Sequence, residues 1–222
     1  LVLGHKLCLQ KKIGGIINCS INKKNIFKKK NFGVTEFLAK KNNIYNSEVM
    51  MIYNKKLSVV PLTTHIKINE ISKLLKKKLI INKINTLNKV YFKYFKKKPR
   101  IAILGLNPHN YELKKNSEEV KIILPAIKSL KKKFKVSGPY PSDTIFFKEN
   151  LKKFDVIFGM YHDQVLAPFK ALFGFDAVNI TLGLPYIRMS PDHGVAMDKK
   201  KLNISNPKSL NRCIEIISKL SK

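Results

Sequence analysis

The stretch IAILGL, residues 101–106, is a short apolar run with the length and composition of a buried β-strand. Two more runs share these properties, LSVVPL at residues 57–62 and VIFGM at residues 156–160. GGIIN at residues 14–18 and VNITL at residues 178–182 are weaker candidates. Because the strong runs are apolar throughout, they are typical of strands in a parallel sheet that is covered on both faces.

Helical patterns occupy the segments between these runs, over about residues 69–95, 118–134 and 207–220. The last of them has Asn206 as a plausible cap and Pro207 at the expected first helical position. Alternation of strands with helices predicts an α/β fold with a largely parallel sheet.

The formal net charge of +30 raises the question of nucleic-acid binding. Only three of the 44 basic residues are arginines, and the lysines are spread almost everywhere outside the apolar runs. A nucleic-acid groove favours arginine and interleaved aromatic residues, and neither pattern is present. Compositional drift of an A+T-rich genome explains the lysines better, so we expect no nucleic-acid partner.

The three cysteines, Cys8, Cys19 and Cys213, are scattered and form no CxxC pair. This argues against a disulfide framework and a cysteine zinc site, and for a reducing, cytoplasmic location. No apolar run approaches the ~18 residues that span a bilayer, so we expect no membrane partner.

Three of the five histidines share one context, since His65, His109 and His162 each lie a few residues past a predicted strand. In a parallel sheet these strand ends share one edge, where α/β folds place their ligand sites. Three neutral imidazoles with an open position suit a catalytic divalent metal. The alternative is that they are ordinary loop histidines. Likewise, Asp163 could orient a ligand, act as a base or be a routine turn residue.

Several motifs follow one another in a recognisable order. They are TEFLA (35–39), TTHI (63–66), GLNPH (105–109), GPYPSDTIF (138–146), YHDQVLAPFK (161–170), VNITLGLPYIR (178–188) and PDHGVAMD (191–198), with SINK (20–23) as a weaker one. Together they resemble the 4-hydroxythreonine-4-phosphate dehydrogenase family from about Ile16 onward. Any one of these strings alone is weak evidence, but the ordered set is specific.

The resemblance implies a divalent metal ion (zinc, magnesium, cobalt or similar) held by His65, His109 and His162. These are the histidines that the strand-end argument selects independently. The resemblance further implies that His162 and Asp163 serve the catalytic step. Thr35 would contact the substrate.

The resemblance also implies that the substrate phosphate is held by Lys170, Asn179 and Arg188, which supply a point charge, an amide donor and a guanidinium. NAD is the implied hydride acceptor. By analogy with the wider isocitrate and isopropylmalate dehydrogenase group, the cofactor-side residues are the following three: His193, Gly194 and Asn206. His193 could equally be a loop residue that precedes a helix.

Relatives in this family are similar in fold to that wider group, with two α/β/α domains around a cleft, and they work as homodimers with a shared active site. On this basis residues 1–19 and 185–222 would belong to the first, cofactor-side domain, and residues 20–184 to the second. The glycine-rich opening of the family precedes SINK and is mostly lacking here, so we expect the first domain to be incomplete.

Three further departures stand out. Val34 replaces the histidine of a substrate-contacting His-Thr pair, so one hydrogen bond is lost. NYELKKNSEE at residues 110–119 replaces a glycine-rich stretch, which makes the same loop conformation harder to adopt. Lysines occupy Lys199–Lys201 in the expected cofactor loop, where the wider group has small residues.

The expected function is NAD-dependent oxidation of 4-phosphohydroxy-L-threonine in pyridoxal phosphate synthesis. One alternative is a sister dehydrogenase acting on another four-carbon phosphorylated hydroxy acid. The other is a degenerate, inactive remnant.

Overall fold

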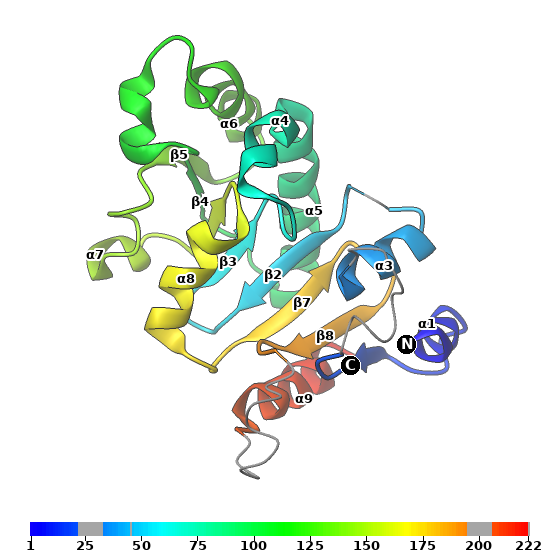
Figure 1. Ribbon diagram of the computed structural model, residues 1–222. Coiled ribbons are helices and arrows are strands. Elements are labelled where there is room, and N and C mark those ends of the chain that lie inside the picture. The colour runs from blue at the N-terminus through cyan, green and yellow to red at the C-terminus, as the bar shows by residue number, and fades with distance from the viewer. Residues whose placement is uncertain (22–32, 45, 195–205, 222) are drawn as a thin grey trace. The chain divides into compact units, whose positions relative to one another are not determined.

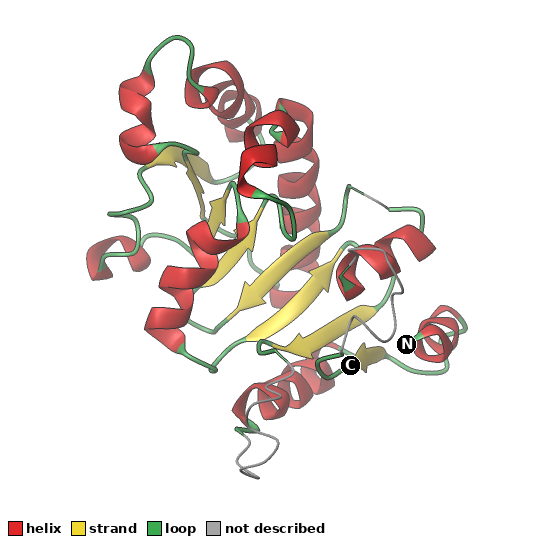
Figure 2. Cartoon of the chain, in the orientation of Figure 1, coloured by secondary structure: helices red, strands yellow, loops and turns green. Residues whose placement is uncertain are grey.

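The computed structural model describes residues 1–21, 33–44, 46–194 and 206–221. The chain divides into two compact units, Leu1–Asn54 with Phe173–Lys222, and Lys55–Leu172. Both units contain strands and helices (Figures 1 and 2). No helix within the described ranges is long and apolar enough to cross a membrane.

Four parallel strands form the sheet of the unit Lys55–Leu172. In spatial order they are β3 (Ser58–Pro61), β6 (Val156–Gly159), β4 (Ile101–Leu104) and β5 (Val136–Tyr140). Every residue of β3, β4 and β6 is buried. The three strong apolar runs are therefore confirmed as buried parallel strands.

Helical segments connect these strands. They are η1 (Ile68–Glu70), α4 (Ile71–Leu74), α5 (Lys77–Phe95), η2 (Pro108–Leu113), the π-helical turn η3 (Glu119–Ile123), α6 (Leu124–Lys131), α7 (Lys148–Leu151) and α8 (His162–Phe173). The helix predicted over residues 69–95 is interrupted at Leu75, where ψ is 115°. Leu75 is buried, so its place in the core outweighs local helix propensity.

The unit formed by Leu1–Asn54 and Phe173–Lys222 has a mixed arrangement. Its strands lie in the order β1 (Gly15–Ile17), β8 (Ile187–Pro191), β7 (Val178–Leu182) and β2 (Val49–Tyr53), and its helices are α1 (Val2–Leu9), α3 (Val34–Lys41) and α9 (Lys208–Leu220). β7 is antiparallel to both β2 and β8. β1 is parallel to β8, so the expectation of a largely parallel sheet is wrong in this unit for two of the three strand pairs. For β7 and β8 the reason is their short connection, with Gly183 at φ 98°, which permits only an antiparallel return.

The last helix begins close to the predicted position. The Asn206 side chain accepts a hydrogen bond from the Lys208 N–H at 3.0 Å, as its capping role predicts. Pro207 lies just before the first helical residue.

Along the chain, the boundaries between the two compact units fall between residues 54 and 55 and between residues 172 and 173. The predicted domains divide instead between residues 19 and 20 and between residues 184 and 185. Because compact units need not coincide with the domains of a whole protein, the domain division stays a prediction.

Candidate functional site

The three candidate metal ligands follow three neighbouring strands of one parallel sheet. His65 follows β3, His109 lies in η2 after β4, and His162 opens α8 after β6. Because β6 pairs with both β3 and β4, the three strand ends share one edge. The strand-end placement of the histidines is confirmed, while their role stays a prediction.

His65 and His162 lie close together, with ring centres 5.9 Å apart. Two imidazoles that bind one ion at about 2.0–2.1 Å have ring centres about 4.5–5.5 Å apart, so this pair lies close to the spacing for a shared metal but slightly beyond it. His162 Nδ1 lies 2.6 Å from Asp163 Oδ1. A ring that donates from Nδ1 to the carboxylate presents the Nε2 lone pair to a ligand.

His109 does not join this pair within the chain. Its side chain is 78% exposed, and its Nε2 lies 3.6 Å from Asp143 Oδ2. Among the described residues, no group of three or more His, Cys, Asp or Glu side chains is arranged to hold a metal ion. One copy of the chain therefore assembles two of the three predicted ligands.

The loop that carries His109 has an unusual backbone. From His109 to Leu113, five consecutive non-glycine residues have φ between 47° and 56°. This is the left-handed region, which costs an L-residue roughly 1–2 kcal/mol. This stretch thus adopts dihedral angles that favour glycine, although it contains none.

A buried carboxylate, Glu119, holds the start of the same loop. Its Oε1 accepts hydrogen bonds from the backbone N–H groups of Leu106 and Asn107, both at 2.8 Å. The Asn107 amide also donates to Glu119 and to Glu118. Burial raises the pKa of Glu119, but these hydrogen bonds lower it more, so the net pKa lies below its usual value. The charged form of the Glu119 carboxylate therefore stabilises the loop.

A second polar group lies on one face of β7 and β8. Thr181 pairs across the strands with Arg188, which donates to Thr181 Oγ1 at 3.0 Å and to Asn18 Oδ1 at 2.8 Å. Thr35 on α3 lies 3.1 Å from Thr181, Oγ1 to Oγ1. Asn179 is two residues before Thr181, so it shares the same face, and its buried Oδ1 has no hydrogen-bond partner among the described residues.

Arg188 is a buried cation with uncharged hydrogen-bond acceptors. It is 3% exposed. Burial lowers its pKa to about 10, and the attraction of Cys213, Glu36 and Tyr186 only partly opposes this. A guanidinium in this state gains from an anionic ligand that supplies the missing negative charge.

Lys170, the third predicted phosphate ligand, lies half-buried near the end of α8. It belongs to the unit Lys55–Leu172, whereas Asn179 and Arg188 belong to the other unit. The structure therefore brings two of the three predicted phosphate ligands onto one face, and a joint site with Lys170 stays a prediction.

The predicted cofactor-side residues flank residues 195–205, which lie outside the described residues and include the lysines at 199–201. The His193 carbonyl accepts a hydrogen bond from Ser20 at 2.5 Å, and its ring packs edge-on against Phe175. A Cβ added at Gly194 would meet no atom of the described residues within 4 Å, so packing among those residues does not require this glycine. Asn206 caps α9 through its Oδ1.

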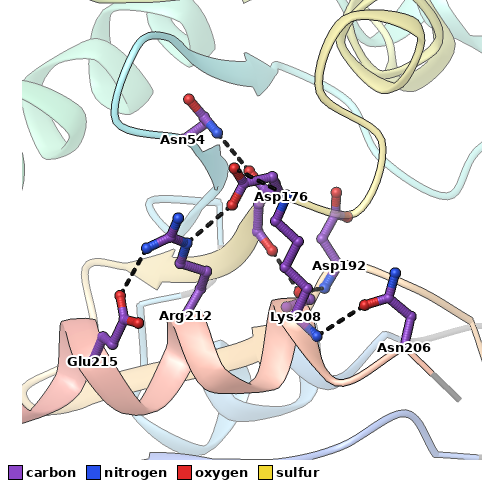
Figure 3. A network of polar contacts seen from close by, with 9 residues as sticks. Asn54, Asp176, Asp192, Asn206, Lys208, Arg212 and Glu215 are labelled. Carbon is purple, nitrogen blue, oxygen red and sulfur yellow. Dashed lines mark hydrogen bonds and ion pairs between the residues drawn. The ribbon is translucent and has the colours of Figure 1, made fainter.

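A polar network anchors the first turns of α9 (Figure 3). Asp176 accepts a hydrogen bond from Arg212 Nε at 3.0 Å and lies 3.5 Å from Lys208 Nζ. Arg212 also pairs with Glu215 at 2.9 Å, and Asn54 donates to the Asp176 carbonyl. The Arg212 hydrogen bond is the main cause that lowers the pKa of Asp176. The network therefore ties α9 to the turn before β7.

The family model of pyridoxal phosphate biosynthetic protein PdxA matches residues 1–217. The chain is 42% identical over 213 residues to 4-hydroxythreonine-4-phosphate dehydrogenase of Aquifex aeolicus, which covers 94% of this chain and 65% of that protein. The chain belongs to the PdxA family.

The enzyme of the same name from Sulfurihydrogenibium is 39% identical, over 94% of this chain and 65% of that relative. The crystal structure of the Klebsiella pneumoniae enzyme has a TM-score of 0.82 at 32% identity and covers 98% of this chain and 68% of that chain. This PdxA-family chain thus has the α/β fold of its relatives and spans about 65% of the length of the curated ones.

Five polar residues of the two clusters were not selected as site residues from the sequence. They are Asn18, Glu119, Asp143, Gln164 and Thr181. Asp143, Gln164 and Thr181 lie inside the quoted motifs, so the motifs carried a signal for them. Asn18 and Glu119 lie outside, and only the folded chain brings them to their partners.

Proposed function

We propose that this chain catalyses NAD-dependent oxidation of 4-phosphohydroxy-L-threonine. The product would be 2-amino-3-oxo-4-phosphooxybutanoate, which loses carbon dioxide to give 3-amino-2-oxopropyl phosphate. Membership of the PdxA family and the curated relatives of this activity support the proposal.

The buried Arg188 carries the proposal. Its acceptors, Asn18 and Thr181, are uncharged, and Asn179 lies on the same face of β7, where its amide N–H could donate to a bound phosphate. A phosphate would supply the counter-charge and accept two N–H bonds from the planar guanidinium. Lys170 would add a point charge to the same group.

The donor set after β3 and β6 fits a divalent metal in part, because His65 and His162 lie close to the required spacing and His109 does not join them within the described residues. When bound, such an ion would polarise the substrate hydroxyl and stabilise the charge that develops on its oxygen. Asp163 holds the ring of His162 in one orientation through the 2.6 Å contact at Nδ1. His109 would complete the set from a second copy of the chain.

The proton balance follows from oxidation of a secondary alcohol. The carbinol carbon transfers a hydride to the nicotinamide ring, and the hydroxyl oxygen loses a proton to a base. Asp163 is the candidate base, because its carboxylate is 81% exposed beside His162. His193, Gly194 and Asn206 would face the dinucleotide, and a glycine at position 194 would permit close backbone approach.

The whole enzyme would have two α/β/α domains around a cleft, similar to isocitrate and isopropylmalate dehydrogenases. We propose that it works as a cytoplasmic homodimer with active sites shared between subunits. The separation of His109 from the other two histidines supports sharing, since a single copy does not assemble the triad.

The first experiment measures NADH formation from 4-phosphohydroxy-L-threonine by purified, metal-loaded protein. We expect a signal that depends on metal and is abolished in His162→Ala. His193→Ala is the comparison variant for the cofactor side, and it should raise the KM for NAD more than that for the substrate. Absence of turnover by a folded, metal-binding protein would refute the proposed activity.

Val34 favours a second candidate function. The resemblance implies a histidine that contacts the substrate at this position, and valine cannot replace its hydrogen bond. A sister dehydrogenase for another four-carbon phosphorylated hydroxy acid would keep the phosphate and metal groups and differ at this end. Higher kcat/KM with threonate or erythronate phosphates would favour this alternative.

Failure to bind NAD or to melt cooperatively would favour an inactive remnant.

A further inference from the structure

The side chain of Gln164 is a buried amide that uses both of its ends. It is 7% exposed and lies in the first turn of α8, two residues after His162. Its Oε1 accepts a hydrogen bond from the Met160 N–H at 2.6 Å. Its Nε2 donates to the Gly105 carbonyl and to Ser142 Oγ, both at 2.7 Å.

These three contacts reach three different loops of the unit Lys55–Leu172. Met160 follows β6, Gly105 follows β4, and Ser142 follows β5. One side chain therefore connects the ends of three neighbouring parallel strands, at the edge where the candidate metal ligands lie.

Each connected loop leads to a residue of the candidate metal site. The loop after β6 leads to His162, and the loop after β4 leads to His109. The loop after β5 continues from Ser142 to Asp143, whose Oδ2 lies 3.6 Å from His109 Nε2. Gln164 thus binds the two loops that meet in the His109–Asp143 contact.

The packing around Gln164 leaves little room for another arrangement. A Cβ added at Gly159 would lie 2.8 Å from Gln164 Oε1 and 2.5 Å from Val165 Cγ1. A Cβ added at Gly105 would collide with the Asn110 side chain. Gly159 therefore lets the backbone of β6 approach this amide closely, and Gly105 leaves room for the Asn110 side chain beside the carbonyl that Gln164 contacts.

We propose that Gln164 is a positioning residue, which sets the spacing between the loops that carry His162, His109 and Asp143. The inference rests on the proposed metal-dependent function. A fully bonded buried amide fixes geometry more strictly than apolar packing, because each misplaced partner would lose a hydrogen bond in a dry environment.

The test compares Gln164→Met with Val165→Ala. Methionine has a similar volume but leaves the Met160 N–H and the Gly105 carbonyl without their partner. Val165 is also buried in α8, and its truncation destabilises the chain without removing a hydrogen bond. Full-length proteins are titrated with Co²⁺, whose visible absorption reports the number and geometry of its ligands.

We expect Gln164→Met to weaken Co²⁺ binding about 10–100-fold and to change the spectrum, as loss of outer-sphere partners does. Val165→Ala should keep the wild-type spectrum at about the wild-type affinity. Equal spectra and affinities for Gln164→Met and wild type would overturn the inference. If wild type itself fails to bind Co²⁺, the proposed metal site is wrong and the next measurement decides about Gln164.

That measurement is amide hydrogen exchange without metal. In Gln164→Met we expect at least tenfold faster exchange at Met160 and in the loops 105–109 and 141–144, and no such change in Val165→Ala. Unchanged exchange in these segments would overturn the inference. If Gln164→Met does not fold, Ser142→Ala removes a single contact of the amide, and it should show the same changes at smaller size.

Discussion

At the scale of single residues, Arg188 is the most informative side chain, because it is buried with two uncharged acceptors. Arg188→Lys keeps the positive charge but removes the planar guanidinium group, which can donate two parallel hydrogen bonds to one anion. We expect the KM for the phosphorylated substrate to rise about 10–100-fold, with a smaller change in kcat. Steady-state kinetics checks this, or calorimetry of substrate binding if turnover is low.

Arg212→Lys is the matched control, since Arg212 pairs with Asp176 and Glu215 on α9 and carries no predicted substrate role. It should leave the KM unchanged. If both substitutions raised the KM for the phosphorylated substrate by the same factor, Arg188 would affect this KM only through the stability of the protein.

Glu119 is the second informative residue. Its folded-state pKa lies below its usual value of about 4.3, so its charged form contributes stability above about pH 4.3, which is lost as the pH falls through the lowered pKa. At pH 7 we expect Glu119→Gln to lower the free energy of unfolding by about 1–3 kcal/mol. Urea unfolding between pH 7 and pH 3.5 should show this difference shrinking below about pH 4.

Exposed Glu149 provides the comparison, because Glu149→Gln removes a carboxylate for which no hydrogen bond is recorded in the described part of the chain. It should change stability little at any pH. If the loss of unfolding free energy in Glu119→Gln stayed constant from pH 7 down to pH 3.5, it would not depend on the charge of Glu119. That result would contradict the proposed role of the charged carboxylate.

At the scale of elements, the left-handed run from His109 to Leu113 stores backbone strain. Glu112 has φ 48° and a side chain that is 79% exposed. Glu112→Gly should therefore raise the free energy of unfolding by about 1 kcal/mol, since glycine adopts this conformation without a Cβ clash. Chemical denaturation measures the change.

The same substitution in a right-handed helix should have the opposite sign. Glu149→Gly in α7 is expected to lower stability by about 0.5–1 kcal/mol. Destabilisation by both substitutions would argue against the left-handed conformation of η2.

At the scale of the whole molecule, the proposed shared site predicts complementation. His65→Ala and His109→Ala should each be inactive. If His65 and His162 come from one subunit and His109 from the other, a mixed dimer contains one intact site. Random reassociation of equal amounts should then restore about a quarter of the wild-type activity, by the statistics of isologous dimers.

Activity assays after mixed refolding, with sedimentation to confirm the dimer, check this prediction. Mixing His65→Ala with His162→Ala is the control and should restore nothing, since both histidines lie on the same subunit. No recovery in either mixture would place all three ligands on one chain.

The amino-acid sequence alone predicted β3, β4 and β6, the placement of histidines at their ends, and the capping role of Asn206. Each of these depends on a few consecutive residues. The strands are continuous apolar runs, and the cap is a side chain that reaches a backbone N–H two residues away. β2, β5 and β8 were not singled out. β5 contains a Gly-Pro pair that is uncommon in strands, and VMMIY in β2 suits a buried helix equally well.

Only the tertiary structure decided which side chains meet. Arg188 contacts Asn18, which lies 170 residues earlier in the chain, and Glu119 reaches back to the loop before His109. The tertiary structure also separates His109 from His65 and His162, although all three follow neighbouring strands. The physical reason is that hydrogen bonding and burial of polar groups depend on partners that the fold brings together, whereas strand and helix formation depends largely on local pattern.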